Sequence, residues 1–188
     1  MFTAAVGYVF FNAVGSAAPT PALRKTIDLE DTSDWAATGW NNIGHTSRND
    51  MPEFGFDGGD TEMKGTWQRK RLRELETGDP VADYLTLQLQ QFDDTALALY
   101  YGANSSATAG IFGVSGASVL PEHAFLVVIV DGAERLGFYA PKASVKRDDA
   151  ISMPVDDFAS LPIKATFLNH GTADLYQWIN EDLFNPAP

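Results

Sequence analysis

Three histidines, His45, His123 and His170, are the side chains best suited to acid–base or metal chemistry in this sequence. A zinc or iron site needs several ligands that converge, often from positions with a fixed short spacing. These histidines are isolated, and none has a second histidine or a carboxylate at metal-ligand spacing on the same helix face. We therefore predict no metal site and no cofactor. A small hydrolase that uses His45 or His170 is the weakest alternative that the sequence leaves open.

Other chemical motifs are incomplete. Serine, histidine and aspartate are all present, but no G-x-S-x-G elbow accompanies them. The segment 113–118 (GVSGAS) lacks the lysine of a phosphate-binding loop, and 58–62 (GGDTE) lacks the alternating ligands of a calcium loop. The chain has no cysteine, which excludes disulfides, thiolate metal sites and a cysteine nucleophile. We predict no catalytic residue, so the chain is not expected to be an enzyme.

Charge gives the clearest hint of a contact surface. The formal net charge is −12, from 25 acidic and 13 basic residues. Such a surface repels nucleic acid, because phosphate binding requires clustered Lys and Arg. The one dense basic cluster lies at 69–73 (RKRLR) and comprises Arg69, Lys70, Arg71 and Arg73. It is either a docking patch for the acidic surface of another copy or a solvated strand or loop, and a nucleic-acid patch is a weaker third reading.

The elements that must position these residues are mostly short strands. The clearest is 84–91 (YLTLQLQQ), where Leu85, Leu87 and Leu89 alternate with polar, uncharged side chains. Further strands are expected at 6–11, 39–46, 61–67, 125–130, 136–140, 145–147 and 162–168, with 111–114 as another candidate. Asp131-Gly132 indicates a hairpin between two of them. The pattern predicts a β-sandwich or β-barrel.

Two helices are expected beside the strands. Residues 93–101 favour a helix of about two turns, with Asp93 or Asp94 as its cap and Gly102 as its stop. Near-helical spacing of apolar residues at 173–184 indicates a C-terminal amphipathic helix. We expect one domain over 1–188, with an N-terminal strand and arm at 1–24 and a long loop or hairpin region at 47–80. Within that region, the glycine-rich segment 47–60 is predicted to be loop.

The first eighteen residues resemble the apolar core of a signal peptide, but no Lys or Arg precedes Arg24. This apolar stretch is too short to span a bilayer, so we expect no membrane association. The signal-like start nevertheless supports one alternative function, a secreted or cell-surface β-sandwich that binds a ligand.

Several whole segments resemble the siphophage major tail tube protein family, particularly its branch in phages of actinobacteria. They are the apolar strand that runs into G-x-A-A-P-T at 15–20, the segment WNNIGHT at 40–46 with MPEFGFDGGDT at 51–61, and 83–92 followed by a helix that ends LYYG. The resemblance implies a β-sandwich with a flanking helix. It also implies stacked hexameric rings that form a tube through which DNA is ejected, located in the virion and assembled in the host cytoplasm.

The resemblance assigns roles to the residues named above. It implies that the partners are other copies of the chain, the tape-measure protein and the tail-tip or terminator proteins, and that DNA passes without specific binding. Thr86, Gln88 and Gln90 are then the candidates for facing the lumen. The arm, with Pro19 and Pro21, joins the basic cluster as a candidate for contact between subunits.

Overall fold

Strands dominate the structure, as the alternating and β-branched segments predict. The computed structural model describes residues 6–19, 28–30, 38–59, 61–64, 66–69, 73–76, 79–116 and 120–180. The elements in chain order are β1 (Val6–Asn12), β2 (Asn41–Asn42), β3 (Glu53–Asp57), β4 (Thr61–Lys64), β5 (Arg73–Glu76), β6 (Ala82–Leu89), α3 (Asp94–Tyr101), β7 (Glu122–Asp131), β8 (Glu134–Arg147), β9 (Leu161–Phe167) and β10 (Gln177–Ile179). The prediction of a mainly β fold with a short flanking helix is confirmed.

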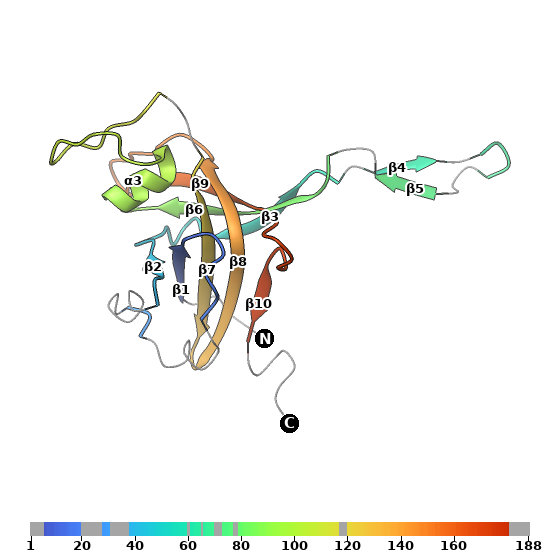
Figure 1. Ribbon diagram of the computed structural model, residues 1–188, viewed down its shortest axis with the longest axis horizontal. Coiled ribbons are helices and arrows are strands. Elements are labelled where there is room, and N and C mark those ends of the chain that lie inside the picture. The colour runs from blue at the N-terminus through green and yellow to red at the C-terminus, as the bar shows by residue number, and fades with distance from the viewer. Residues whose placement is uncertain are drawn as a thin grey trace.

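The main sheet is antiparallel and has the order β2-β1-β7-β8-β9-β6-β3. The long strand β8 pairs with β7 along one edge, and its other edge is shared between β10 in the first half and β9 in the second. The β7–β8 register shifts between His123 and Phe125, opposite Pro141. A bulge bends a strand and tolerates a residue that has no N–H to donate. Beyond this bend, β9, β6 and β3 run across β1, β7 and β8 (Figure 1).

The core lies between these two parts of the sheet. The leucines of β6, Leu85, Leu87 and Leu89, are buried there, together with Phe125 of β7 and Phe138 of β8. A second cluster covers the opposite face of β7, where Leu126 and Val128 pack with Phe10, Trp40 and Leu29. Both faces of β7 are therefore buried, which explains why its sequence is an apolar run and not an alternation.

Helix α3 forms where the sequence predicts it. Oδ1 of Asp93 accepts a hydrogen bond from the backbone N–H of Ala96 at 2.8 Å, and this caps the first turn. Gly102, at φ 92°, ends the helix and donates its N–H to the carbonyl of Ala98. Ala96, Leu99 and Tyr100 are buried against the sheet. Among the described residues, no helix has the length and apolar character needed to cross a bilayer.

Three expectations about secondary structure are wrong. The segment 47–60 is not all loop, because β3 pairs with β6 inside it. Residues 111–114 form no strand. Residues 173–180 form no helix, and β10 pairs with β8 there instead; 181–184 lie outside the described residues. The reason is aromatic packing, because Tyr176 and Trp178 stack on Phe138 at ring distances of 5.4 and 5.0 Å, which outweighs the helical spacing.

Candidate assembly surfaces

A long β-ribbon projects from the body of the molecule (Figure 1). It begins as the pairing of β3 with β6, and it ends as the pairing of β4 with β5. Between the two, Gly58 and Gly59 adopt φ values of 83° and 78°, and the N–H of Gly59 donates to the carbonyl of Asp79. A Cβ at Gly58 would lie 2.8 Å from the carbonyl oxygen of Pro80, so only glycine fits this close approach. We call β4, β5 and the residues between them the projecting hairpin.

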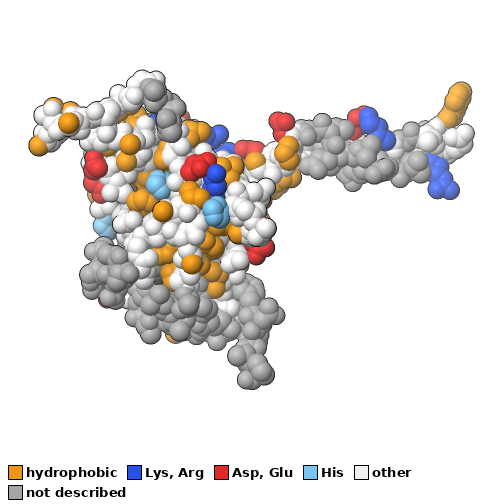
Figure 2. Space-filling model, viewed as in Figure 1, with side chains coloured by type: hydrophobic (Ala, Val, Ile, Leu, Met, Phe, Trp, Pro, Cys, Tyr) orange, Lys and Arg blue, Asp and Glu red, His pale blue; other side chains and the backbone are white. Residues whose placement is uncertain are grey.

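The outer end of the projecting hairpin is basic. Residues 64–73, which we call the tip, contain five basic and no acidic residues, whereas the rest of the chain contains eight basic and 25 acidic residues. Thr66 and Arg69 close a turn with two backbone hydrogen bonds of 2.8 and 3.1 Å. Between them, Trp67 is 100% exposed. Figure 2 shows a hydrophobic and a basic side chain on the described part of this end. An exposed tryptophan beside clustered cations is typical of a protein contact surface.

The structure describes only some of the basic residues that are predicted to contact another subunit. Arg69 is exposed at the turn. Arg73 begins β5, where its Cα partner across the hairpin is Lys64. Lys70 and Arg71 lie outside the described residues. Sequence reasoning missed Lys64 and Trp67, although a tryptophan beside a basic run was the available signal.

The register of the hairpin pairs two residues of like charge, Lys64 and Arg73. Such a cross-strand pair destabilises a hairpin by a few tenths of a kcal/mol to about 1 kcal/mol. An ion pair of 2.5 Å between Lys64 and Glu62 offsets part of this cost, but both side chains are at least half exposed. The fold of the hairpin therefore does not account for its positive charge.

The first half of the N-terminal arm packs on its own chain. The N–H of Gly15 donates to the carbonyl of Pro141, and the hydroxyl of Tyr139 donates to the carbonyl of Ser16. The indole N–H of Trp40 donates to the carbonyl of Ala17 at 3.2 Å. Pro19 is buried, so little of its ring is available to a neighbour, and Pro21 lies outside the described residues. The part of the arm that the structure describes is thus a strap over the second core cluster.

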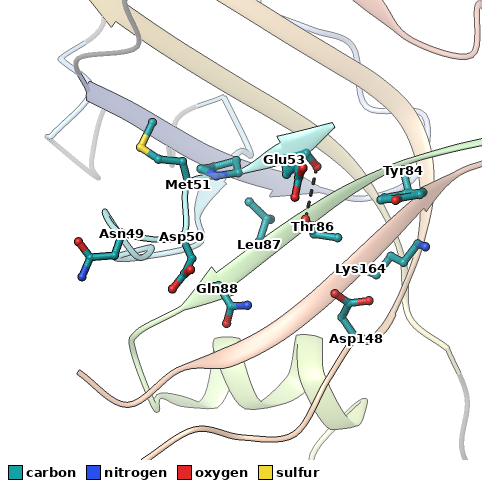
Figure 3. A pocket seen from close by; sticks show the side chains of 11 residues that line it. Asn49, Asp50, Met51, Glu53, Tyr84, Thr86, Leu87, Gln88, Asp148 and Lys164 are labelled. Carbon is teal, nitrogen blue, oxygen red and sulfur yellow. Dashed lines mark hydrogen bonds between the residues drawn. The ribbon is translucent and has the colours of Figure 1, made fainter. Parts of the chain in front are cut away.

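The outward face of β6 lines a polar hollow of about 670 Å³ (Figure 3). Thr86 and Gln88, two of the predicted lumen residues, point into it, and Tyr84 lies on the same face. The third, Gln90, is half-buried just after the strand and donates its N–H to the carbonyl of His45. The predicted alternation of β6 is confirmed, because its leucines are buried and its polar residues are turned away from the core.

Carboxylates outnumber cations in the hollow. Asp50, Glu53 and Asp148 line it, together with Lys164. The ammonium group of Lys164 lies 2.5 Å from a carboxylate oxygen of Asp57, and this hydrogen bond raises the pKa of Lys164 above its ordinary value. The lysine is therefore charged at neutral pH and already paired within its own chain. The hollow presents an excess of negative charge.

The structure does not bring the histidines together into a site. Among the described residues, no group of three or more His, Asp or Glu side chains could hold a metal ion. The His123 ring packs edge-on against Phe11 with ring centroids 5.2 Å apart. Burial lowers the pKa of His123 below its ordinary value of 6.5, and a hydrogen bond with the backbone of Asn12 acts in the opposite direction. This histidine is a neutral packing residue at physiological pH.

Comparison with known proteins places the chain in a family. The chain matches the family described as phage tail tube protein over residues 1–188. It is 57% identical over 186 residues to the major tail protein Gp23 of Mycobacterium phage L5, covering 98% of this chain and 93% of that protein. It is 56% identical over 189 residues to the major tail protein Gp23 of Mycobacterium phage D29, covering 100% of this chain and 94% of that protein. The chain therefore belongs to the phage tail tube protein family, and it is a structural tail subunit and not an enzyme.

Proposed function

We propose that this subunit assembles into hexameric rings, and that the rings stack head to tail into a tube that conducts DNA during ejection. The observation that carries the proposal is the projecting hairpin. It holds a basic tip away from a body that is otherwise strongly acidic. A tip that cannot reach the acidic surface of its own body is suited to the acidic surface of another copy.

The contact made by such a hairpin is heterologous, because the tip of one copy meets a different surface of the next. Heterologous contacts generate closed rings when the rotation closes and open filaments when it does not. The hairpin strands rise about 3.3 Å per residue, so the seven steps along the chain from Asp57 to Lys64 span at most about 23 Å. We infer that this reach brings the tip to an adjacent ring. Arg69, Lys70, Arg71 and Arg73 are its proposed contact residues.

Within one ring, neighbouring subunits contact each other through the edges of the main sheet. Among the described strands, β3 pairs only with β6, which leaves one edge of β3 available to another chain. Pairing of strand edges between neighbouring subunits removes edges that would otherwise promote uncontrolled aggregation. The polar face of β6, with Thr86, Gln88 and Gln90, then lines the lumen. The carboxylates of the adjacent hollow keep DNA from adhering to this wall by like-charge repulsion.

The position of the subunit in the phage tail determines its remaining partners. The subunit assembles in the host cytoplasm, surrounds the tape-measure protein during assembly, and contacts tail-tip and terminator proteins at the two ends of the tube. The alternative of a secreted ligand-binding sandwich gains no support from either relative, since both are major tail proteins. DNA passes through the tube without a specific binding site.

Negative-stain electron microscopy of the purified chain over a range of concentrations tests the proposal. We expect rings or tubes with a central channel and sixfold symmetry in end-on views. Mass photometry at the lower concentrations should detect an oligomer of six subunits. A ring with another number of subunits would overturn the hexamer alone, whereas a monomer at every concentration and salt condition would overturn the proposed function.

A further inference from the structure

One loop of this charged protein carries no charge. From Thr95 to Pro121 the sequence contains 27 residues without Asp, Glu, Lys or Arg, although charged residues make up 20% of the chain. The part that leaves the body is 103–116, which we call the uncharged loop. It projects beyond α3 (Figure 1), and Figure 2 shows only white and orange side chains on its described part. An uncharged projection with apolar side chains is a candidate for a contact surface.

The uncharged loop exposes apolar side chains on an ordered backbone. Ile111 and Val114 are 55% and 54% exposed. The amide of Asn104 ties the base of the loop: its oxygen accepts from the N–H groups of Ser106 and Gly113, and its nitrogen donates to Asp94 and to the carbonyl of Ile111. A loop held in this way loses little conformational entropy when it binds a partner.

A complementary hollow lies elsewhere on the molecule. A groove of about 470 Å³ lies between the outer parts of β1 and β7 and the segment before β3. We call it the apolar groove. Arg48 is the one charged side chain that lines it, and its main apolar residues are Val6, Met51, Phe54, Val127 and Ile129. Val6 and Met51 are 49% and 46% exposed at its rim.

The two surfaces lie toward different ends of β7 within one copy. The chain from the uncharged loop enters β7 at Glu122, whereas the apolar groove is lined by Val127 and Ile129 toward the other end of that strand. Seven steps along the strand lead from Glu122 to Ile129, which is about 23 Å. An apolar projection at one end and an apolar groove at the other are the two halves of a heterologous contact between copies.

We propose that the uncharged loop of one subunit packs into the apolar groove of the next. The inference rests on the proposed function, because it specifies a second contact within that assembly, independent of the basic tip. Charge explains why this loop and not the tip occupies the groove. The tip would bring five cations toward Arg48, whereas the loop buries no charge and pays no penalty for desolvating one.

Crosslinking tests the contact directly, because the chain has no native cysteine. The double variant Ile111→Cys with Met51→Cys carries one thiol in the loop and one in the groove. Tubes assembled from this variant are treated with a short bis-maleimide. They should give a ladder of covalent oligomers, because each copy becomes linked to two neighbours. Each single variant should stop at dimers. The control pair Ile111→Cys with Val155→Cys, whose second thiol is exposed outside the groove, should give no ladder.

Charge substitution gives a second readout. Ile111→Asp and Met51→Asp should each raise the critical concentration for assembly at least tenfold, while the melting temperature of the subunit stays unchanged, because both side chains are half exposed. Val155→Asp, at a fully exposed position elsewhere, should leave assembly unchanged. Assembled tubes of the Ile111→Cys with Met51→Cys variant that give no ladder would overturn the inference and leave the proposed function intact. A wild-type chain that never assembles would overturn both.

Discussion

Reversal of one charge at the tip separates the folding of the projecting hairpin from its use in assembly. Arg73→Glu replaces the like-charged Lys64–Arg73 pair by an opposite-charged pair across β4 and β5. Cross-strand pairs of opposite charge contribute roughly 0.2–1 kcal/mol, and like pairs cost a similar amount. The hairpin itself should therefore become more stable by about 0.5–2 kcal/mol in this variant.

Assembly should change in the opposite direction. The substitution removes one attraction to an acidic neighbour and introduces one repulsion, each worth about 0.2–1 kcal/mol for exposed groups. The total is about 0.5–2 kcal/mol per subunit contact, which corresponds to a rise of about twofold to thirtyfold in the critical concentration. Adding Arg69→Glu should increase the effect further. Salt should weaken wild-type assembly more than assembly of the variants, because ions screen the attraction of the tip.

The assay combines sedimentation of tubes over a range of protein and salt concentrations with amide hydrogen exchange of β4 and β5 in the free subunit. Lys146→Glu is the matched control. It makes the same change in net charge, and it also relieves a like-charged cross-strand pair, with Lys164, but it lies on β8 and outside the tip. We expect slower exchange with weaker assembly in Arg73→Glu, and unchanged assembly in Lys146→Glu. If Arg73→Glu assembles as well as the wild type, the tip is a solvated surface and the docking argument is refuted.

Three further predictions concern the fold. Leu87→Ala should lower the free energy of unfolding by about 2–5 kcal/mol in urea titrations, because Leu87 is 1% exposed between the two parts of the sheet. Tyr139→Phe should cost about 1 kcal/mol in the same assay, because it leaves the carbonyl of Ser16 without that donor and loosens the strap. Acidification should destabilise the subunit below pH 6.5, because burial lowers the pKa of His123 and the unfolded chain then binds more protons. In His123→Gln, the part of the stability loss that His123 causes should be absent. Urea unfolding of the variant and the wild type from about pH 6.5 to about pH 5 measures this difference.

Each of these predictions has a result that contradicts it. Thr86→Ala, next to Leu87 but on the polar face, is the control for the core substitution and should change stability by less than about 0.5 kcal/mol. Equal losses in the two variants would mean that the two faces of β6 are assigned wrongly. An unchanged stability of Tyr139→Phe would show that the strap contributes nothing. Identical pH profiles for His123→Gln and the wild type would show that another group causes the acid loss.

Elements with strong local signals were predictable. The alternation of β6, the capped helix α3, and the Asp131-Gly132 turn between β7 and β8 each depend on neighbouring residues alone. The strands expected at 136–140 and 145–147 are joined into one strand, β8, and the register shift beside Pro141 shows why proline is tolerated there. In these cases, local preference and tertiary packing agree.

Elements that depend on distant partners were not predictable. Strand β3 consists of EFGFD in a glycine-rich region, and it becomes a strand because β6 offers a paired edge and Phe54 packs on Phe138 at 4.6 Å. Strand β10 has helical spacing in sequence, but its aromatic side chains pack on β8. The basic cluster was visible in the sequence. The placement of Arg69 beside an exposed tryptophan and of Arg73 opposite Lys64, on a projecting hairpin, was not.

The central claim is that this subunit builds a tube from contacts between its own copies. Electron cryomicroscopy of tubes assembled from the purified chain tests it most directly, because helical averaging locates the projecting hairpin and the lumen wall together. The account predicts stacked rings of six subunits, with the basic tip against a neighbouring ring and the polar face of β6 on the bore. A tube whose bore is lined by the opposite, leucine-bearing face, or whose hairpins extend into solvent, would contradict it.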